Sequence, residues 1–132
     1  MNDQYQANKF LSLKDKVILI AEDEEINYRF LEIILLRTGA KILRAKNGHE
    51  AVEICRKNKN IDIILMDIKM PILNGYEATA KIKEFRKDLP IIAQTAFASQ
   101  DDLEMCHQAG FTDYITKPIN IHLLIQKITG YL

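Results

Sequence analysis

Polar side chains of three kinds stand at the ends of short apolar segments in this chain of 132 residues. Glu22 and Asp23 follow the first such segment, Asp67 ends the most apolar one, and Thr95 and Lys117 follow two later ones. Clustered carboxylates repel one another, and this raises their pKa values unless a cation joins them. Because carboxylate oxygens suit hard divalent ions, the acidic residues predict a Mg²⁺ site if the fold brings them together.

The same residue types suit phosphoryl transfer. A lysine ammonium is a point charge that fits a phosphoryl oxygen, and a threonine hydroxyl can hydrogen-bond a second one. An aspartate carboxylate can act as the nucleophile and form an aspartyl-phosphate. This chemistry depends mainly on positioning and on neutralisation of charge, and these side chains provide both. A polar residue at one strand end is usually only the point where the chain meets water, so the hypothesis needs a fold that gathers them.

Short β-branched runs predict the strands of that fold. Three continuous apolar runs, at 16–21, 61–66 and 90–94, are typical of strands buried on both faces of a parallel sheet. Two weaker candidates lie at 41–45 and 113–116. Because ligands bind at the carboxyl ends of parallel strands, the polar residues that follow these runs would share one edge.

Helical patterns separate the strands. Ile26, Phe30, Ile33 and Ile34 recur at helical spacing, and Gly39 follows as a stop signal. Four more helices are expected after Asn47-Gly48, over 76–87, between the N-cap Ser99 and Gly110, and after the N-cap Asn120. Strands that alternate with helices predict an α/β fold, a doubly wound parallel sheet of five strands with five helices.

Composition limits the classes of protein that this chain can belong to. Lys plus Arg and Asp plus Glu are 18 each, so the formal net charge is zero. This balance argues against a general nucleic-acid binder and a polybasic membrane anchor. No apolar run approaches the ~20 residues of a membrane-spanning helix. Cys55 and Cys106 are expected to be free thiols of a reduced cytoplasmic protein.

Four motifs in order carry a resemblance to a known family. They are Val17-Ile-Leu-Ile-Ala-Glu-Asp-Glu, Met66-Asp-Ile-Lys-Met-Pro with Gly75, Gln94-Thr-Ala-Phe-Ala, and Tyr114-Ile-Thr-Lys-Pro. With these separations the chain resembles the receiver domains of two-component response regulators over residues 16–132, and residues 1–15 are expected to be a tail or linker. The resemblance implies a flavodoxin-like sheet with strand order 2-1-3-4-5.

The resemblance also implies a phosphoacceptor and a metal site. Asp67 would accept the phosphoryl group from a phosphohistidine. Mg²⁺ would be held by Asp23, Asp67 and the backbone carbonyl of Lys69, with Glu22 acting through water. The domain would then catalyse its own phosphorylation and dephosphorylation and would be an enzyme only in that limited sense.

Other residues receive roles by the same resemblance. Lys117 would bind the phosphoryl group, and its bond to Pro118 is typically cis in the family. Thr95 would move toward the phosphoryl oxygen, and the Tyr114 ring would turn inward as the hydroxyl moves, so these two form the expected switch. The catalytic set is therefore Asp67, Lys117 and Thr95. Lys69 and Phe97, two residues after the acceptor and the hydroxyl, would tune hydrolysis.

The implied partners are a histidine kinase or a histidine phosphotransfer domain, and a weak homodimer is a further expectation. No direct contact with nucleic acid or membrane is expected. The runs at 22–27, 47–52 and 90–98 resemble receivers at the C-terminus of hybrid sensor histidine kinases. In that setting the chain would be the cytoplasmic part of a membrane-bound kinase, whereas a stand-alone response regulator would look similar.

Three alternatives compete with a phosphorylated receiver. A pseudo-receiver would keep the fold as an interaction module without phosphorylation, although Asp67, Asp23 and Lys117 are all present. A nucleotide-binding α/β protein would carry GxGxxG or GxxxxGK[ST], and neither occurs. A phosphatase of the haloacid dehalogenase type would need a second aspartate where this chain has Lys69.

Overall fold

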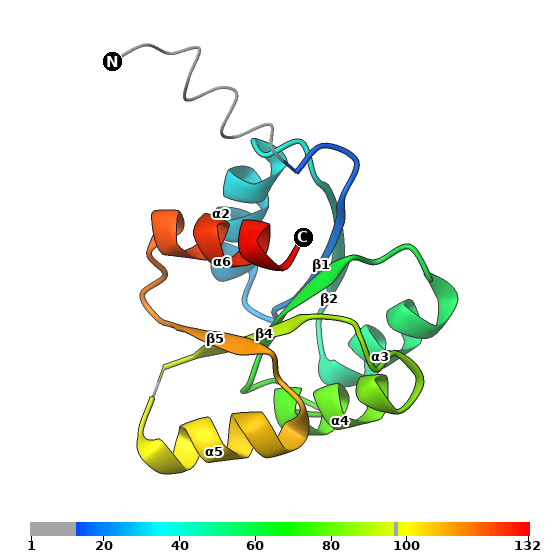
Figure 1. Cartoon of the computed structure of the whole chain (residues 1–132), viewed down its shortest axis with the longest axis vertical. Coiled ribbons are helices and arrows are strands. Elements are labelled where there is room, and N and C mark those ends of the chain that lie inside the picture. Colours follow the sequence, from blue (N-terminus) through cyan, green and yellow to red (C-terminus); the bar gives the residue numbers. More distant parts are fainter. Residues whose placement is uncertain (1–12, 97) are drawn as a thin grey trace.

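Five strands alternate with five helices in the computed structural model, which describes residues 13–96 and 98–132 (Figure 1). The strands are β1 Val17–Ala21, β2 Lys41–Ala45, β3 Ile63–Asp67, β4 Ile91–Thr95 and β5 Asp113–Thr116. The helices are α2 Glu25–Leu36, α3 Gly48–Lys57, α4 Gly75–Phe85, α5 Gln100–Ala109 and α6 Ile121–Tyr131. The predicted alternation is therefore confirmed, with boundaries that differ by a few residues.

The strands form one parallel sheet in the order β2-β1-β3-β4-β5. This is the predicted doubly wound order. β3 lies at the centre between β1 and β4, and its residues are buried throughout because helices cover both faces. The sheet therefore places the end of β3 beside the ends of its two neighbours.

Two hydrophobic layers hold the helices on the sheet, and alternate strand residues feed each layer. One face carries Leu19, Ile64 and Met66 and is covered by α3, α4 and α5. The other carries Ile18, Ile20 and Leu65 and is covered by α2 and α6 (Figure 1). The central strands thus have no solvent-facing side, which explains why their sequences are continuous apolar runs.

Most of the helices have an N-terminal side-chain cap, and the predicted N-cap residues Ser99 and Asn120 are confirmed. The Ser99 side chain accepts a hydrogen bond from the Asp102 N–H, and the Asn120 side chain accepts one from the Leu123 N–H. At the end of α5, Gly110 adopts the left-handed conformation with φ 103°. A residue with a Cβ would be strained there, so Gly110 ends the helix as expected.

Helix α2 buries Ile34 but not the other three residues of the predicted periodic pattern. Ile26, Phe30 and Ile33 are 84%, 44% and 57% exposed. The buried positions are Tyr28, Leu31, Ile34 and Leu35. The helix is apolar on two sides, and only the sheet decides which side is covered. The exposed residues Ile26, Phe30 and Ile33 are called the α2 stripe below.

The first described residue, Leu13, packs against the rest of the chain. Leu13 is 2% exposed, and its N–H donates to the carbonyl of Thr38 at 3.0 Å. Residues 1–12, most of the expected tail, lie outside the described residues, as does Phe97. Both cysteines are buried free thiols. Among the described residues, no helix has the length and apolar character needed to cross a bilayer.

Truncation of one buried side chain in the central strand β3 tests how much stability the buried core contributes. Ile64 is fully buried in β3, so Ile64→Ala should lower the free energy of unfolding by about 2–5 kcal/mol through lost burial and a new cavity. Urea denaturation followed by circular dichroism measures this. Ile33→Ala, at an exposed position of the α2 stripe, should change stability by less than about 0.5 kcal/mol. Equal losses in the two variants would contradict this packing.

Candidate functional site

The predicted acidic residues meet at the carboxyl edge of the sheet. Glu22 follows β1 directly, and Asp67 is the last residue of β3, in register with Gln94 of β4. One carboxylate oxygen from each of Glu22, Asp23 and Asp67 lies within 4.8 Å of the others. Glu22 is 0% exposed and Asp67 5% exposed, whereas Asp23 faces solvent. Two acidic groups are thus buried side by side next to a third.

The pKa of Glu22 shows that this arrangement disfavours the charged form of its carboxyl group. Burial raises the pKa of Glu22 well above its usual range, and the neighbouring charge of Asp67 adds to the rise. The backbone N–H of Glu24, which donates to Glu22 Oε2 at 3.1 Å, acts in the opposite sense. A cation at this point would therefore stabilise the charged form of the cluster.

Lys117 supplies one positive charge to the cluster. Its Nζ lies 3.2 Å from Asp67 Oδ1 and 3.8 Å from Glu22 Oε1, and its side chain is 28% exposed. The backbone holds the residue in place, since the Lys117 N–H donates to the carbonyl of Thr95 at 2.9 Å. The Lys117–Pro118 peptide bond is cis. A flexible ammonium is thus held within contact distance of two buried carboxylates.

Two glycines hold the loop of residues 68–74 against the site. The Gly75 N–H donates to the carbonyl of Ile68 at 2.8 Å, and a Cβ at Gly75 would collide with the carbonyl oxygen of Asp67. The Gly48 N–H donates to the carbonyl of Leu73 at 3.0 Å, and a Cβ there would collide with that oxygen. Backbone packs directly on backbone at both points, so the loop has little freedom behind Asp67.

A single open cleft is lined by most of the predicted residues. These are Asp23, Asp67, Lys69, Thr95 and Lys117. Glu22 lies in an adjoining pocket that also reaches Lys117. The structure therefore brings together acidic, hydroxyl and ammonium groups from the ends of four strands, although Phe97 lies outside the described residues.

The oxygen set of the cluster fits Mg²⁺. Glu22 Oε1 is buried and has no hydrogen-bond partner among the described residues. The cluster offers one carboxylate oxygen from each of Glu22, Asp23 and Asp67, with neither nitrogen nor sulfur in the set. Hard divalent ions with retained waters prefer such ligands. A buried carboxylate oxygen without a hydrogen bond, with the Lys117 ammonium only at 3.8 Å, is consistent with a site that takes up a cation.

A family model described as the response regulator receiver domain matches residues 18–129. The chain belongs to this family. The polar-differentiation response regulator DivK of Brucella anthropi is 37% identical over 89% of this chain and 96% of its own length. Hybrid signal transduction histidine kinase I of Dictyostelium discoideum is 42% identical over 84% of this chain. The chain matches only 7% of that kinase's length.

Solved receiver domains share both the fold and much of the sequence. The receiver of Ssk1 from Saccharomyces cerevisiae, in complex with the histidine phosphotransfer protein Ypd1, has TM-score 0.83 and 35% identity over 89% of each chain. The receiver of PA1611 from Pseudomonas aeruginosa, with a magnesium ion in its active-site cleft, has TM-score 0.79 and 37% identity. That match covers 88% of this chain and 98% of the solved one.

The predicted switch pair of the receiver lies on one face of the sheet. Ala93 is in register with Tyr114, and Thr95 follows Ala93 by two residues, so Thr95 and Tyr114 share that face. Tyr114 is half-buried, and Lys127 Nζ lies 5.2 Å from its ring centroid. The same ammonium contacts Asp113 Oδ1 at 2.9 Å. Helix α6 is thus tied to edge strand β5 next to the tyrosine.

Two polar residues near the site were not singled out from the sequence. Arg44 is a charged residue inside β2, and Gln94 is buried in β4 with its amide nitrogen unpartnered among described residues. A polar residue within a predicted strand is the available signal for both. It could not show what either side chain contacts, because those contacts come from other segments.

The Asp113 contacts predict a pH-dependent contribution to stability. Burial alone would raise the pKa of Asp113, but hydrogen bonds from Lys127, the Tyr114 N–H and the Tyr131 hydroxyl outweigh it and lower the pKa. A lowered pKa in the folded state gives stability that is present above the unfolded-state pKa and is lost as pH falls through the folded value. Asp113→Asn should therefore cost about 1 kcal/mol at pH 7.

The difference in free energy of unfolding between Asp113→Asn and wild type should shrink as the pH falls toward 3.5. Urea unfolding at several pH values measures this difference. Asp88→Asn, at an exposed aspartate, is the matched control and should cost less than about 0.5 kcal/mol at every pH. An Asp113→Asn penalty that does not change with pH would contradict the ionic origin of the effect.

Proposed function

We propose that this receiver domain accepts a phosphoryl group onto Asp67 from a phosphohistidine. The observation that carries the proposal is the approach of Lys117 Nζ to Asp67 Oδ1 at 3.2 Å within an acidic cluster. Asp67 lies at the mouth of the sheet, where a donor can approach, and its backbone is fixed by β3 and by Gly75. A carboxylate nucleophile is thus held beside the charge that the incoming group requires.

The transfer is a displacement at phosphorus. A carboxylate oxygen of Asp67 forms the new P–O bond while the P–N bond to the donor imidazole breaks, and the imidazole nitrogen keeps the electron pair and takes up a proton. Lys117 is placed to pair with a phosphoryl oxygen as charge shifts, and Thr95 can donate its hydroxyl to another. Later attack of water on phosphorus releases inorganic phosphate and restores the carboxylate.

We infer that Asp23, Asp67 and the backbone carbonyl of Lys69 hold Mg²⁺, with Glu22 acting through water. When bound, the ion neutralises charge on the carboxylates and on the phosphoryl oxygens. The Glu22 oxygen without a hydrogen bond and the pKa of that residue, raised by burial and by Asp67, support this role, since a cation there would stabilise the buried carboxylate. The magnesium-containing PA1611 receiver, 37% identical, supports the same assignment.

Thr95 and Tyr114 are proposed to report phosphorylation. A hydroxyl that moves toward the new phosphoryl oxygen vacates space on the face that it shares with the tyrosine ring. The ring can then turn inward, away from Lys127. This is a local charge event that biases a two-state element, with β5 and its flanking helices as the surface that changes.

Asp67→Asn should abolish labelling. Incubation with acetyl phosphate and Mg²⁺ should add one phosphoryl group to the wild-type protein, as measured by intact mass. In the variant the amide is a poor nucleophile, while loss of one buried charge leaves the fold intact by circular dichroism. Excess chelator should stop labelling of the wild type.

An undiminished mass shift in Asp67→Asn, or labelling in excess chelator, would contradict the assignment of acceptor or metal site. An unlabelled wild type, under conditions where DivK is labelled, would favour the pseudo-receiver, an interaction module that is never phosphorylated.

The α2 stripe is the proposed docking face for the donor. It starts three residues after Asp23, and Phe30 borders a pocket shared with Lys117 and Pro118. A donor that covers Ile26, Phe30 and Ile33 would present its histidine over the acidic cluster. The yeast receiver solved with Ypd1 supports a histidine phosphotransfer domain or kinase as this partner. The similarity to a hybrid kinase receiver supports a place within such a protein.

Phe30→Glu should slow transfer from phosphorylated Ypd1 at least tenfold, because a charge in an apolar contact opposes docking. Labelling by acetyl phosphate, which needs no docking face, should stay unchanged, and phosphoryl loss from Ypd1 on a gel measures the rate. Asn60→Glu introduces the same charge at the opposite edge of the sheet and should transfer as wild type. Equal rates in the two variants would contradict this docking face.

A further inference from the structure

The acidic loop, residues 22–24 between β1 and α2, needs its backbone fixed if its side chains are to act as ligands. The Glu22 N–H donates to the carbonyl of Ala45 at 3.0 Å, which continues the pairing of β1 with β2 by one step. The chain then turns away into α2, so the Glu22 carbonyl loses the backbone partner that a longer strand would offer. A buried carbonyl in this position requires another donor.

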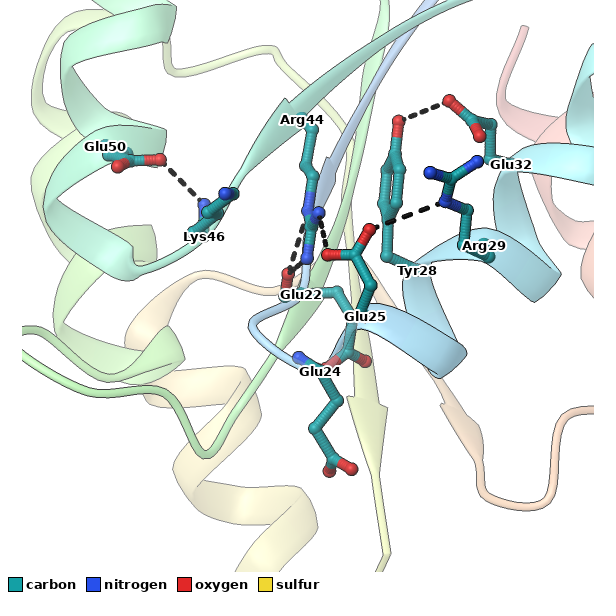
Figure 2. Close-up of polar contacts among 9 residues, drawn as sticks. All are labelled: Glu22, Glu24, Glu25, Tyr28, Arg29, Glu32, Arg44, Lys46 and Glu50. Carbon is teal, nitrogen blue, oxygen red and sulfur yellow. Dashed lines mark hydrogen bonds and ion pairs between the residues drawn. The ribbon is translucent and has the colours of Figure 1, made fainter.

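The Arg44 guanidinium provides that donor (Figure 2). Its Nη2 and Nε lie 3.2 Å and 3.4 Å from the Glu22 carbonyl oxygen. Its Nη1 contacts Glu25 Oε1 at 2.7 Å, in the first turn of α2. One planar group therefore spans both ends of the acidic loop, the last residue paired with β2 and the first residue of the helix.

Packing fixes the guanidinium itself. Its Cζ lies 4.2 Å from the centroid of the Tyr28 ring, which is 7% exposed. The Tyr28 hydroxyl donates to Glu32 at 2.8 Å, so the ring is held at its far end (Figure 2). The Arg44 side chain is only 15% exposed, whereas Arg29, which also contacts Glu25, is 66% exposed. Arg44 is thus a largely covered guanidinium with all three nitrogens engaged, unlike the exposed Arg29 ion pair.

We propose that Arg44 is the positioning residue of the acidic loop, which by gripping the Glu22 carbonyl holds the Glu22 and Asp23 carboxylates in the arrangement that binds Mg²⁺. This rests on the proposed function. Arg44 acts through the backbone and does not contact the ion. A lysine cannot replace it, because the grip uses two donors on one carbonyl, a third on Glu25 and a flat face on Tyr28.

The direction in which Mg²⁺ affinity changes when Arg44 is removed distinguishes a positioning role from a purely electrostatic one. Arg44 is a cation close to a cation site, so by charge alone its removal should strengthen Mg²⁺ binding. If the residue positions the loop, its removal should weaken binding, because ligands that must be ordered on binding cost affinity. A residue needed only for stability would lower the melting temperature without a selective change in Mg²⁺ affinity.

The test is a Mg²⁺ titration of the whole chain without phosphodonor, followed by amide NMR shifts of residues 67–70 and 72–75. Arg44→Met keeps the unbranched stem on Tyr28 and removes every donor. Its dissociation constant for Mg²⁺ should rise at least fivefold. Arg44→Lys keeps the charge and should raise the constant at least twofold. Arg29→Gln removes the exposed guanidinium from Glu25 and should stay within twofold of wild type.

An unchanged or lower dissociation constant in Arg44→Met would overturn the proposal. If that variant does not fold, Arg44→Lys decides: a constant raised at least twofold supports the proposal, and a wild-type value overturns it. The wild-type titration separates this inference from the proposed function. No Mg²⁺ binding by wild type overturns both, whereas Mg²⁺ binding and acetyl phosphate labelling by wild type with no effect of Arg44→Met overturns the positioning role alone.

Discussion

Mutual repulsion among three carboxylates is the constraint around which this receiver domain is arranged. Glu22, Asp23 and Asp67 place oxygens within 4.8 Å of one another, and two of these residues are buried. Such a cluster is unfavourable unless positive charge or backbone donors face it. The structure provides Lys117 from the end of β5 and the N–H of Glu24 from the acidic loop. Glu22 Oε1 nevertheless has no hydrogen-bond partner among the described residues and lies 3.8 Å from the Lys117 ammonium.

Rigid backbone on both sides keeps the cluster from relaxing. Behind Asp67, Gly75 packs directly on its carbonyl, so the loop after β3 cannot retreat. On the β1 side, Arg44 spans the acidic loop from the Glu22 carbonyl to Glu25 (Figure 2). Repulsion between carboxylates that cannot move apart would be relieved by a bound cation. This fixed arrangement of acidic groups is what the proposed binding of a cation and a phosphoryl group would require.

The regions expected to respond are less tightly held. β5 is an edge strand, and its residues Asp113 and Tyr114 are tied to α6 through Lys127 rather than through a second neighbouring strand. Contacts of this kind can be exchanged at small cost when a neighbouring hydroxyl moves. The α2 stripe, the proposed donor surface, lies on a helix that shares its sheet face with α6, and Phe30 borders the pocket of Lys117 and Pro118. The proposed donor surface and the proposed responding surface therefore both adjoin the acidic cluster.

Much of this fold and site followed from local sequence. Apolar runs that alternate with capped helices predicted the doubly wound sheet, because burial on both faces forces continuous apolar strands. The strand ends then named Glu22, Asp23, Asp67, Thr95 and Lys117, since parallel strands deliver their final residues to one edge. Motif spacing added the receiver family and the candidate roles of Lys69 and Tyr114.

Tertiary structure alone decided features that depend on partners distant in the chain. The apolar pattern of α2 has two sides, and the sheet covers the one with Leu31 and Leu35 while it leaves Phe30 exposed. The role of Arg44 depends on a carbonyl 22 positions away, which no local pattern encodes. Helical and strand periodicity follow from backbone geometry, so a short segment of sequence is enough to show them. A side-chain contact depends on which surfaces the folded chain brings together.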